Sequence, residues 1–259
     1  SFMSNSLLPI VVMPKTILVF DVDGTLTKAR MNIDAEMRTF MAELRKRTPV
    51  AIVGGSDLTK IVEQLGDNLD DVLAQYDYVF SENGLVGYQG TTQLPSHSIQ
   101  EHIGEERLQD LINEALGFFS RLRLPVKRGN FIEFRKGMLN LCPIGRSCSY
   151  AEREQFVEYD KEHGVRAQLL DHLHSRFPDY GLEFAVGGQI SVDVYPLGWD
   201  KTFCLQYLTP HYDNIHFFGD KTDTGRNDYA IYEDSRTIGH CVTDPADTRS
   251  QVSTLLQQI

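Results

Sequence analysis

The stretch that decides the fold is ILVFDVDGTLT, which occupies residues 17–27. Its apolar, β-branched first half is typical of a buried parallel strand. Asp21 and Asp23 follow, and because side chains alternate along a strand, the two carboxylates would share one side if the strand continued. In an open α/β sheet, the crevice at this end of a strand is where ligands bind. One carboxylate could attack a phosphorus atom while the other moves a proton, with Mg²⁺ neutralising both.

If the acidic turn at residues 21–24 is considered without the rest of the chain, two other interpretations are possible. The sequence D-x-D-G resembles part of an EF-hand, but that pattern needs a glutamate six residues after the glycine, where this chain has Arg30. A strand that simply ends in a solvated acidic turn is the second alternative, because short motifs carry a risk of false matches.

Composition limits the classes of function. The 259 residues allow one large or two modest domains, and the net charge of −11 argues against a general nucleic-acid surface. The apolar segment at residues 7–13 is short and broken by Pro9, which predicts neither a membrane span nor a signal peptide. The four cysteines have no C-x-x-C spacing, so we expect reduced thiols in a cytoplasmic protein.

The first third of the chain alternates strands and helices. Apolar residues at helical spacing predict a helix over residues 33–44, and residues 49–53 read as the next strand. A helix is expected from about Ser56 toward Gly66, followed by a strand at residues 78–80. The serine could cap that helix or hold a phosphate oxygen at its positive end. This β-α-β-α-β order predicts a doubly wound parallel core.

From about residue 88 the pattern changes to clustered strands with helices beside them, which predicts an inserted α+β module. A helix is expected over residues 108–119, and another begins at Ser149, whose capping box with Glu152 precedes an end at Gly164. The strands of the insert are predicted at residues 130–135, 138–142, 182–186 and 189–195, and the core resumes after Pro196 with strands at 215–218 and 241–242 and a helix at 247–258.

Alternation in the inserted strands predicts one polar sheet face that carries Arg135, Asn140, Ser191 and Asp193. This could be the wet side of a half-buried sheet. Charge favours an anion site instead, because eight basic residues but only two acids lie within residues 121–153. Arginine suits bidentate phosphate binding. The eight are Arg121, Arg123, Lys127, Arg128, Arg135, Lys136, Arg146 and Arg153.

Further motifs follow the insert. Lys201 precedes a predicted helix, and the strand at residues 215–218 ends in Gly219-Asp220, with Asn227-Asp228 after it. Carboxylates at a second strand end are what Mg²⁺ needs, because it prefers hard oxygen ligands. Together with residues 17–27 and Ser56, these segments resemble, in order, the four motifs of the haloacid dehalogenase (HAD) superfamily of phosphotransferases.

The insert narrows the resemblance. The segments RGNFIEFRKGMLN (128–140), PIGRSC (143–148), GGQISVD (187–193) and GWDK (198–201) resemble the eukaryotic-type phosphomannomutases of that superfamily. The resemblance extends over residues 16–259 and implies a Rossmann-like HAD core at residues 1–88 and 196–259, with a cap at 89–195 for substrate specificity and dimerisation. One departure is Arg226, which stands where such proteins usually have glycine before Asn-Asp.

The resemblance also implies an activity and its residues. Mannose 6-phosphate and mannose 1-phosphate would interconvert through an aspartyl-phosphate and a hexose 1,6-bisphosphate, which also serves as activator, to supply GDP-mannose synthesis. Asp21 would be the nucleophile and Asp23 the general acid/base, assisted by Ser56 and Lys201. The metal residues would be Asp21, Asp23 (through its carbonyl), Asp220 and Asp228 for Mg²⁺, and Tyr232, Asp234 and Thr237 for a second cation. The substrate residues would be Arg30, Arg135, Met138, Asn140, Arg146, Arg153, Ser191 and Asp193.

Three alternatives stay open. A HAD sugar-phosphate phosphatase would use the same nucleophile with water as acceptor, although the basic cap favours a mutase that must hold a second phosphate. Phosphoglucomutase activity is also compatible with the sequence, because glucose and mannose differ at one hydroxyl. Bisphosphatase activity is a further possibility on the same fold. A non-catalytic sugar-phosphate sensor would be expected to lack Asp21, Asp23 or Asp220, and all three are present.

Overall fold

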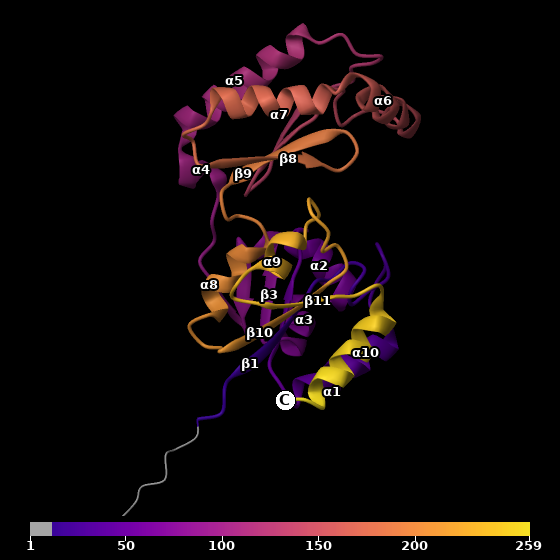
Figure 1. Cartoon of the computed structure of the whole chain (residues 1–259), viewed down its shortest axis with the longest axis vertical. Coiled ribbons are helices and arrows are strands. Elements are labelled where there is room, and N and C mark those ends of the chain that lie inside the picture. The colour runs from indigo at the N-terminus through magenta and orange to yellow at the C-terminus, as the bar shows by residue number, and fades with distance from the viewer. Residues whose placement is uncertain (1–11) are drawn as a thin grey trace, which may run out of the picture. The chain divides into compact units, whose positions relative to one another are not determined.

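The computed structural model describes residues 12–259, so most of the apolar segment at residues 7–13 lies outside the described residues. The chain divides into two compact units (Figure 1). One contains the described residues up to Gly84 together with Tyr88–Gln93 and Cys204–Ile259, and the other contains Leu85–Gly87 and Leu94–Phe203. Within the described part of the chain, no helix combines the length and hydropathy of a membrane span.

The first unit is built on a seven-stranded sheet in the order β11-β10-β1-β2-β3-β4-β5. The pairs β11/β10, β10/β1, β1/β2 and β2/β3 are parallel, and the β4/β5 hairpin is antiparallel. The bounds are β1 (Thr16–Phe20), β2 (Val50–Val53), β3 (Tyr78–Ser81), β4 (Val86–Gln89), β5 (Thr92–Gln93), β10 (Asn214–Gly219) and β11 (Ile238–Cys241).

Helices pack on both faces of this sheet. The helices are α1 (Ala35–Arg45), α2 (Leu58–Leu65), α3 (Leu69–Gln75), α8 (Leu205–Leu208), α9 (Tyr229–Glu233) and α10 (Pro245–Leu256), with a 3₁₀ turn η1 (Glu82–Gly84). Buried side chains of α1, α2, α3 and α10 form one cluster with Leu18 and Phe20 of β1. On the opposite face the ring of Phe80 stacks on Tyr207 of α8, with 6.0 Å between the ring centroids. The central strands are therefore covered on both sides, as their continuous apolar runs predict.

The second unit is a four-stranded antiparallel sheet in the order β6-β7-β9-β8 with helices on one face. The bounds are β6 (Ile132–Phe134), β7 (Leu139–Leu141), β8 (Leu182–Gly187), β9 (Ser191–Pro196), α4 (Ile99–Ile103), α5 (Glu105–Arg121), α6 (Tyr150–His163), α7 (Val165–Arg176) and the 3₁₀ helix η2 (Lys201–Cys204). Figure 1 shows α5 and α7 running across this sheet. Their buried side chains pack with Leu139, Leu141, Val192 and Val194, which leaves the alternate residues of β7 and β9 on the other face.

The prediction of an α/β fold with a doubly wound parallel core is confirmed. The capping box of α6 is present at Ser149 and Glu152, and Gly164 ends that helix in the left-handed conformation. Four short features were not predicted from the sequence, namely α3, α4, α9 and the β4/β5 hairpin. The assignment of core and cap roles to residues 1–88, 196–259 and 89–195 stays a prediction.

Candidate active site

Three carboxylates gather at one end of the parallel sheet. Asp21, Asp220 and Asp228 each offer an oxygen atom, and these atoms lie within 4.8 Å of one another. Asp21 follows β1 and Asp220 follows β10, and these strands are parallel neighbours, so their carboxyl ends meet. The Asp21 backbone N–H donates to the carbonyl of Phe218 at 2.9 Å, which continues the pairing as far as the nucleophile position.

Asp228 belongs to the loop after β10 rather than to a strand. The backbone N–H of Lys221 donates to Asp228 Oδ2 at 3.0 Å, and the Asp228 N–H donates to the Lys221 carbonyl at 3.0 Å. These two bonds close the loop and bring the buried Asp228 carboxylate back to the strand end. Asp220 and Asp228 are close in the sequence, and the structure brings the carboxylates of both next to that of Asp21.

Two glycines leave room for these carboxylates. A Cβ on Gly24, whose φ is +86°, would lie 2.4 Å from Asp220 Oδ2. A Cβ on Gly219 would lie 2.6 Å from Asp228 Oδ2. Both positions therefore need a residue without a side chain if the acidic cluster is to keep its arrangement.

The cluster fits a hard divalent cation. Asp220 Oδ1 is buried without a hydrogen-bond partner among the described residues, and a buried unpaired oxygen is costly. Burial, and then the neighbouring Asp228 carboxylate, raise the pKa of Asp220 above its ordinary value. Mg²⁺ prefers carboxylate oxygens and would offset both penalties. The Asp23 carboxylate is not part of this group, and its carbonyl as a ligand stays a prediction.

The two aspartates of the first motif are held separately. The Thr25 hydroxyl donates to Asp21 Oδ2 at 3.1 Å. Asp23 Oδ1 accepts from the backbone N–H of Arg30 and from Gln64 Nε2, the latter at 3.3 Å. Thr25 and Gln64 were not predicted; a threonine within the motif is a readable signal, but Gln64 is 41 residues from Asp23.

Ser56 lies in the loop after β2 and is partly buried. Its carbonyl accepts from the Glu82 N–H at 2.9 Å. The expectation that Ser56 could cap the next helix is wrong, because the cap of α2 is Asp57, whose carboxylate accepts from the Lys60 N–H at 2.9 Å. A carboxylate at this position also complements the positive end of the helix.

The residues predicted for a second cation lie at the end of α9 and in the turn after it. Asp234 is paired with Arg236 at 2.8 Å, and this pairing lowers the pKa of Asp234. The Thr237 hydroxyl donates to the carbonyls of Ile231 and Asp234 at 2.5 and 3.1 Å. Both side chains thus have protein partners, and a second cation at Tyr232, Asp234 and Thr237 stays a prediction.

The departure at Arg226 does not strain its loop. The left-handed position of this loop is Gly225, with φ +82°, and Arg226 is not among the described non-glycine residues with positive φ. The Arg226 N–H donates to the Asp223 carbonyl at 2.9 Å, and its side chain is exposed. The chain therefore accepts arginine where relatives were expected to have glycine.

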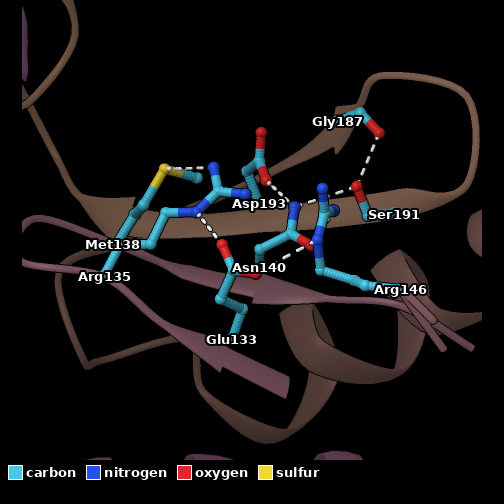
Figure 2. Close-up of polar contacts among 8 residues, drawn as sticks. All are labelled: Glu133, Arg135, Met138, Asn140, Arg146, Gly187, Ser191 and Asp193. Atoms are coloured by element: carbon cyan, nitrogen blue, oxygen red, sulfur yellow. Dashed lines mark hydrogen bonds and ion pairs between the residues drawn. The ribbon is translucent and has the colours of Figure 1, made fainter. Parts of the chain in front are cut away.

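The second unit brings most of its predicted polar residues into one network, which Figure 2 shows. Because side chains alternate along β7 and β9, this network lies on the sheet face opposite the buried side chains that pack with α5 and α7. Asn140 stands at its centre. Its amide Nδ2 donates to Ser191 Oγ at 2.9 Å and to Asp193 Oδ1 at 2.7 Å, and its Oδ1 accepts from Arg146 Nη1 at 2.7 Å. Burial is the main cause that raises the pKa of Asp193.

Glu133 joins two arginines of the network, a role that was not predicted from the sequence. Its Oε1 accepts from Arg135 Nε at 2.6 Å, and its Oε2 lies 3.2 Å from Arg146 Nε. Arg135 Nη1 also lies 3.9 Å from the Met138 sulfur. The signal was available, because Glu133 and Arg135 are two residues apart on one strand and share a face.

Backbone contacts hold Arg146 at the network. Arg146 N–H donates to the Asn130 carbonyl at 3.1 Å, and Arg128 N–H donates to the Ile144 carbonyl at 2.7 Å. A Cβ on Gly145 would lie 2.2 Å from the Gly129 carbonyl oxygen, so the two loops approach as closely as glycine permits. Arg153 makes none of the contacts of the network, and Lys201 lies buried at the start of η2.

Comparison with solved structures identifies the class of fold. An IMP-bound, N-terminally truncated IMP-nucleotidase of Plasmodium falciparum matches with a TM-score of 0.59 at 16% identity, covering 94% of this chain and 68% of that chain. A trehalose-6-phosphate phosphatase of Aspergillus fumigatus matches with a TM-score of 0.55 at 15% identity, covering 95% of this chain and 94% of that one. A haloacid dehalogenase-like hydrolase of Bacteroides thetaiotaomicron has a TM-score of 0.54 at 12% identity, with 84% and 85% covered. The chain thus has the haloacid dehalogenase fold.

Sequence comparison is more specific. A family model described as eukaryotic phosphomannomutase matches residues 37–258. A probable phosphomannomutase of Caenorhabditis elegans is 61% identical over 246 residues, which are 95% of this chain and 97% of that protein. A phosphomannomutase of Schizosaccharomyces pombe is 51% identical over 240 residues, covering 92% and 93%. This chain belongs to the eukaryotic phosphomannomutase family, a family of enzymes.

Proposed function

We propose that this protein interconverts mannose 6-phosphate and mannose 1-phosphate, and so supplies GDP-mannose synthesis in the cytoplasm. The observation that carries the proposal is the cluster of Asp21, Asp220 and Asp228 beside a separately anchored Asp23. This arrangement of carboxylates suits the transfer of a phosphoryl group by way of an aspartyl-phosphate. The high identity to phosphomannomutases supports the choice of hexose phosphates as substrates.

The proposed reaction starts from a hexose 1,6-bisphosphate, which also acts as activator. Asp21 attacks the phosphorus of one phosphate, the bond between phosphorus and the sugar oxygen breaks, and Asp23 gives its proton to that oxygen. The products are a hexose monophosphate and an aspartyl-phosphate. In the reverse direction, a monophosphate bound the other way gives its hydroxyl proton to Asp23 and takes the phosphoryl group from Asp21. Thr25 fixes the orientation of the attacking carboxylate.

Asp21, Asp220 and Asp228 would hold Mg²⁺, which neutralises the negative charge of phosphate and carboxylates when they meet. Ser56 and the buried Lys201 would contact the transferring phosphoryl group, Lys201 by its charge. Tyr232, Asp234 and Thr237 would form the second cation site that the family resemblance implies.

The network of the second unit would bind the sugar and the distal phosphate. Arg135 and Arg146 are held by Glu133 and Asn140, so their guanidinium groups are oriented before a ligand arrives. Arg30, Arg153, Met138, Ser191 and Asp193 complete the proposed substrate set. Residues 89–195 would act as a cap that excludes water from the aspartyl-phosphate and forms a homodimer.

A coupled assay tests the proposal. Mannose 1-phosphate, Mg²⁺ and a trace of hexose 1,6-bisphosphate are supplied, and hexose 6-phosphate and free phosphate are both followed. We expect hexose 6-phosphate that depends on the bisphosphate, with little free phosphate. Release of phosphate without isomer would instead show a phosphatase on the same fold.

The nucleophile is tested with a matched pair of variants. Asp21→Asn should abolish both isomerisation and labelling of the protein by bisphosphate carrying ³²P. The exposed Asp179→Asn makes the same chemical change away from the site and should retain both. Full turnover in Asp21→Asn would refute the proposed covalent mechanism.

A further inference from the structure

Gln64 is a buried polar residue on an otherwise apolar helix face. It lies in the last turn of α2 and is 7% exposed, beside the buried Ile61 and Leu65. A buried amide without partners is costly, so an apolar side chain would suit this face unless the amide had a specific task.

The Gln64 amide has two partners, both of which can only accept. Its Nε2 donates to Asp23 Oδ1 at 3.3 Å and to the Met31 carbonyl at 3.3 Å. Turning the amide round would place its oxygen against a carboxylate and a carbonyl, which is repulsive. The chemistry of the neighbours therefore fixes which end of the amide faces Asp23.

The contacts distinguish the two oxygens of Asp23. Oδ1 accepts from both Gln64 Nε2 and the Arg30 N–H. Among the described residues, none donates a hydrogen bond to Oδ2 of Asp23. One oxygen thus anchors the carboxylate, and the other faces no protein donor.

Gln64 also holds the segment that carries Arg30. Its backbone carbonyl accepts from the Ile33 N–H at 2.7 Å, while its amide binds Met31. Arg30 has φ +61°, a conformation that costs free energy for any residue with a side chain. The side chain and backbone of one residue therefore support both the loop at residues 28–33 and the Asp23 carboxylate.

We propose that Gln64 is a positioning residue for proton transfer by Asp23: it fixes Oδ1 so that Oδ2 meets the sugar oxygen. This inference rests on the proposed function, in which Asp23 gives a proton to the departing sugar oxygen and takes one back. The proton matters when the leaving group is a sugar alkoxide and is dispensable when the leaving group is already stable as an anion.

Gln64→Met tests this, because methionine has a similar length but no donor. For isomerisation of mannose 1-phosphate, we expect kcat to fall about 10- to 100-fold, with KM changed less than about twofold. This is a part of the roughly 10²–10⁴-fold that general acid–base catalysis contributes, because the variant displaces Asp23 but does not remove it. Phosphorylation of Asp21 by acetyl phosphate, whose leaving group is acetate, should change less than about twofold. Equal slowing of both reactions would overturn the proposal, as would no effect on either.

A second measurement does not depend on acetyl phosphate as a substrate. In an Asp23→Asn background, residual isomerisation should be insensitive to Gln64→Met, because both changes remove one function. Multiplicative losses would overturn the proposal. Gln75→Leu is the control, since Gln75 lies in α3, where its Nε2 donates to the Asp71 carbonyl, and it should leave the kinetics unchanged.

The outcomes separate this inference from the function on which it rests. If the parent protein forms no isomer in the presence of bisphosphate, the proposed function fails whatever the variants do. If the parent is active and Gln64→Met isomerises at the parent rate, only the role of Gln64 fails. Unfolding curves of the variant and of Gln75→Leu identify a loss that arises from stability.

Discussion

Two histidines in the first unit predict a specific loss of stability in mild acid. His216 of β10 and His240 of β11 lie with Nδ1 and Nε2 2.9 Å apart, so one ring donates its proton to the other. The His240 ring also stacks on Phe218 with 4.3 Å between centroids. Burial and the nearby His216 lower the pKa of His240 to about 4, and burial lowers that of His216.

The sign and size follow from linkage. An unfolded histidine has a pKa of about 6.5, so between pH 6.5 and 4 the unfolded state binds more protons and stability falls with falling pH. For His240 alone, a shift from about 6.5 to about 4 corresponds to a loss of about 2 kcal/mol between pH 7 and pH 5. His240 is partly exposed, and solvent screening reduces the expected loss to about 1 kcal/mol.

Urea unfolding followed by circular dichroism at pH 7 and pH 5 measures this loss. His240→Gln keeps a polar side chain but removes the titrating group, so its free energy of unfolding should fall about 1 kcal/mol less than that of the parent. His211→Gln, at an exposed position, should follow the parent. If all three proteins lose the same free energy between the two pH values, the histidine pair contributes nothing and the reasoning is refuted.

Two substitutions test the candidate active site. Gly24→Ala places a Cβ 2.4 Å from Asp220 Oδ2 and should lower Mg²⁺-dependent kcat by more than about tenfold, about 1.4 kcal/mol, in a magnesium titration. Gly90→Ala, where φ is +58° and no atom lies within 4 Å, adds similar backbone strain without the clash; equal losses in both would contradict the prediction. Asn140→Ala removes three hydrogen bonds of the second unit and should raise KM for mannose 1-phosphate about tenfold or more. An unchanged KM would mean that the network does not serve the substrate.

The sequence predicted those parts of the protein that depend on local order. Residues 17–20 are apolar, as a strand buried on both faces requires, and Asp21 and Asp23 follow directly, so both the strand and its acidic end could be read from residue types. Alternation in β7 and β9 likewise predicted that Asn140, Ser191 and Asp193 share a face, and the register pairs Asn140 with Asp193. Period-2 patterns carry this information because a one-residue slip would expose the apolar set.

Contacts between segments that are distant in the sequence could not be predicted from residue patterns. In the sequence, nothing distinguishes Gln64 from other helical glutamines, because its contact with Asp23 exists only in the folded chain. The cap of α2 is Asp57 rather than Ser56, and the sequence could not decide between them because either residue type can cap a helix. Glu133 was counted as one acid among many bases, and its position between Arg135 and Arg146 depends on the loop that carries Arg146.

That position of Glu133 bears on the proposed reaction. The Arg135 guanidinium is the first cause that lowers the pKa of Glu133, with the charge of Arg146 adding to it, so this carboxylate is charged at neutral pH. In the proposed reaction, a distal phosphate that approached the Nε side of the two arginines would compete with Glu133, which would weaken their hold on it. Such a limit would suit a mutase, because in the proposed reaction the bisphosphate intermediate would have to leave these arginines and return in the opposite orientation. A phosphatase has no corresponding step, so the acid among the bases agrees better with the exchange of two phosphate positions than with hydrolysis.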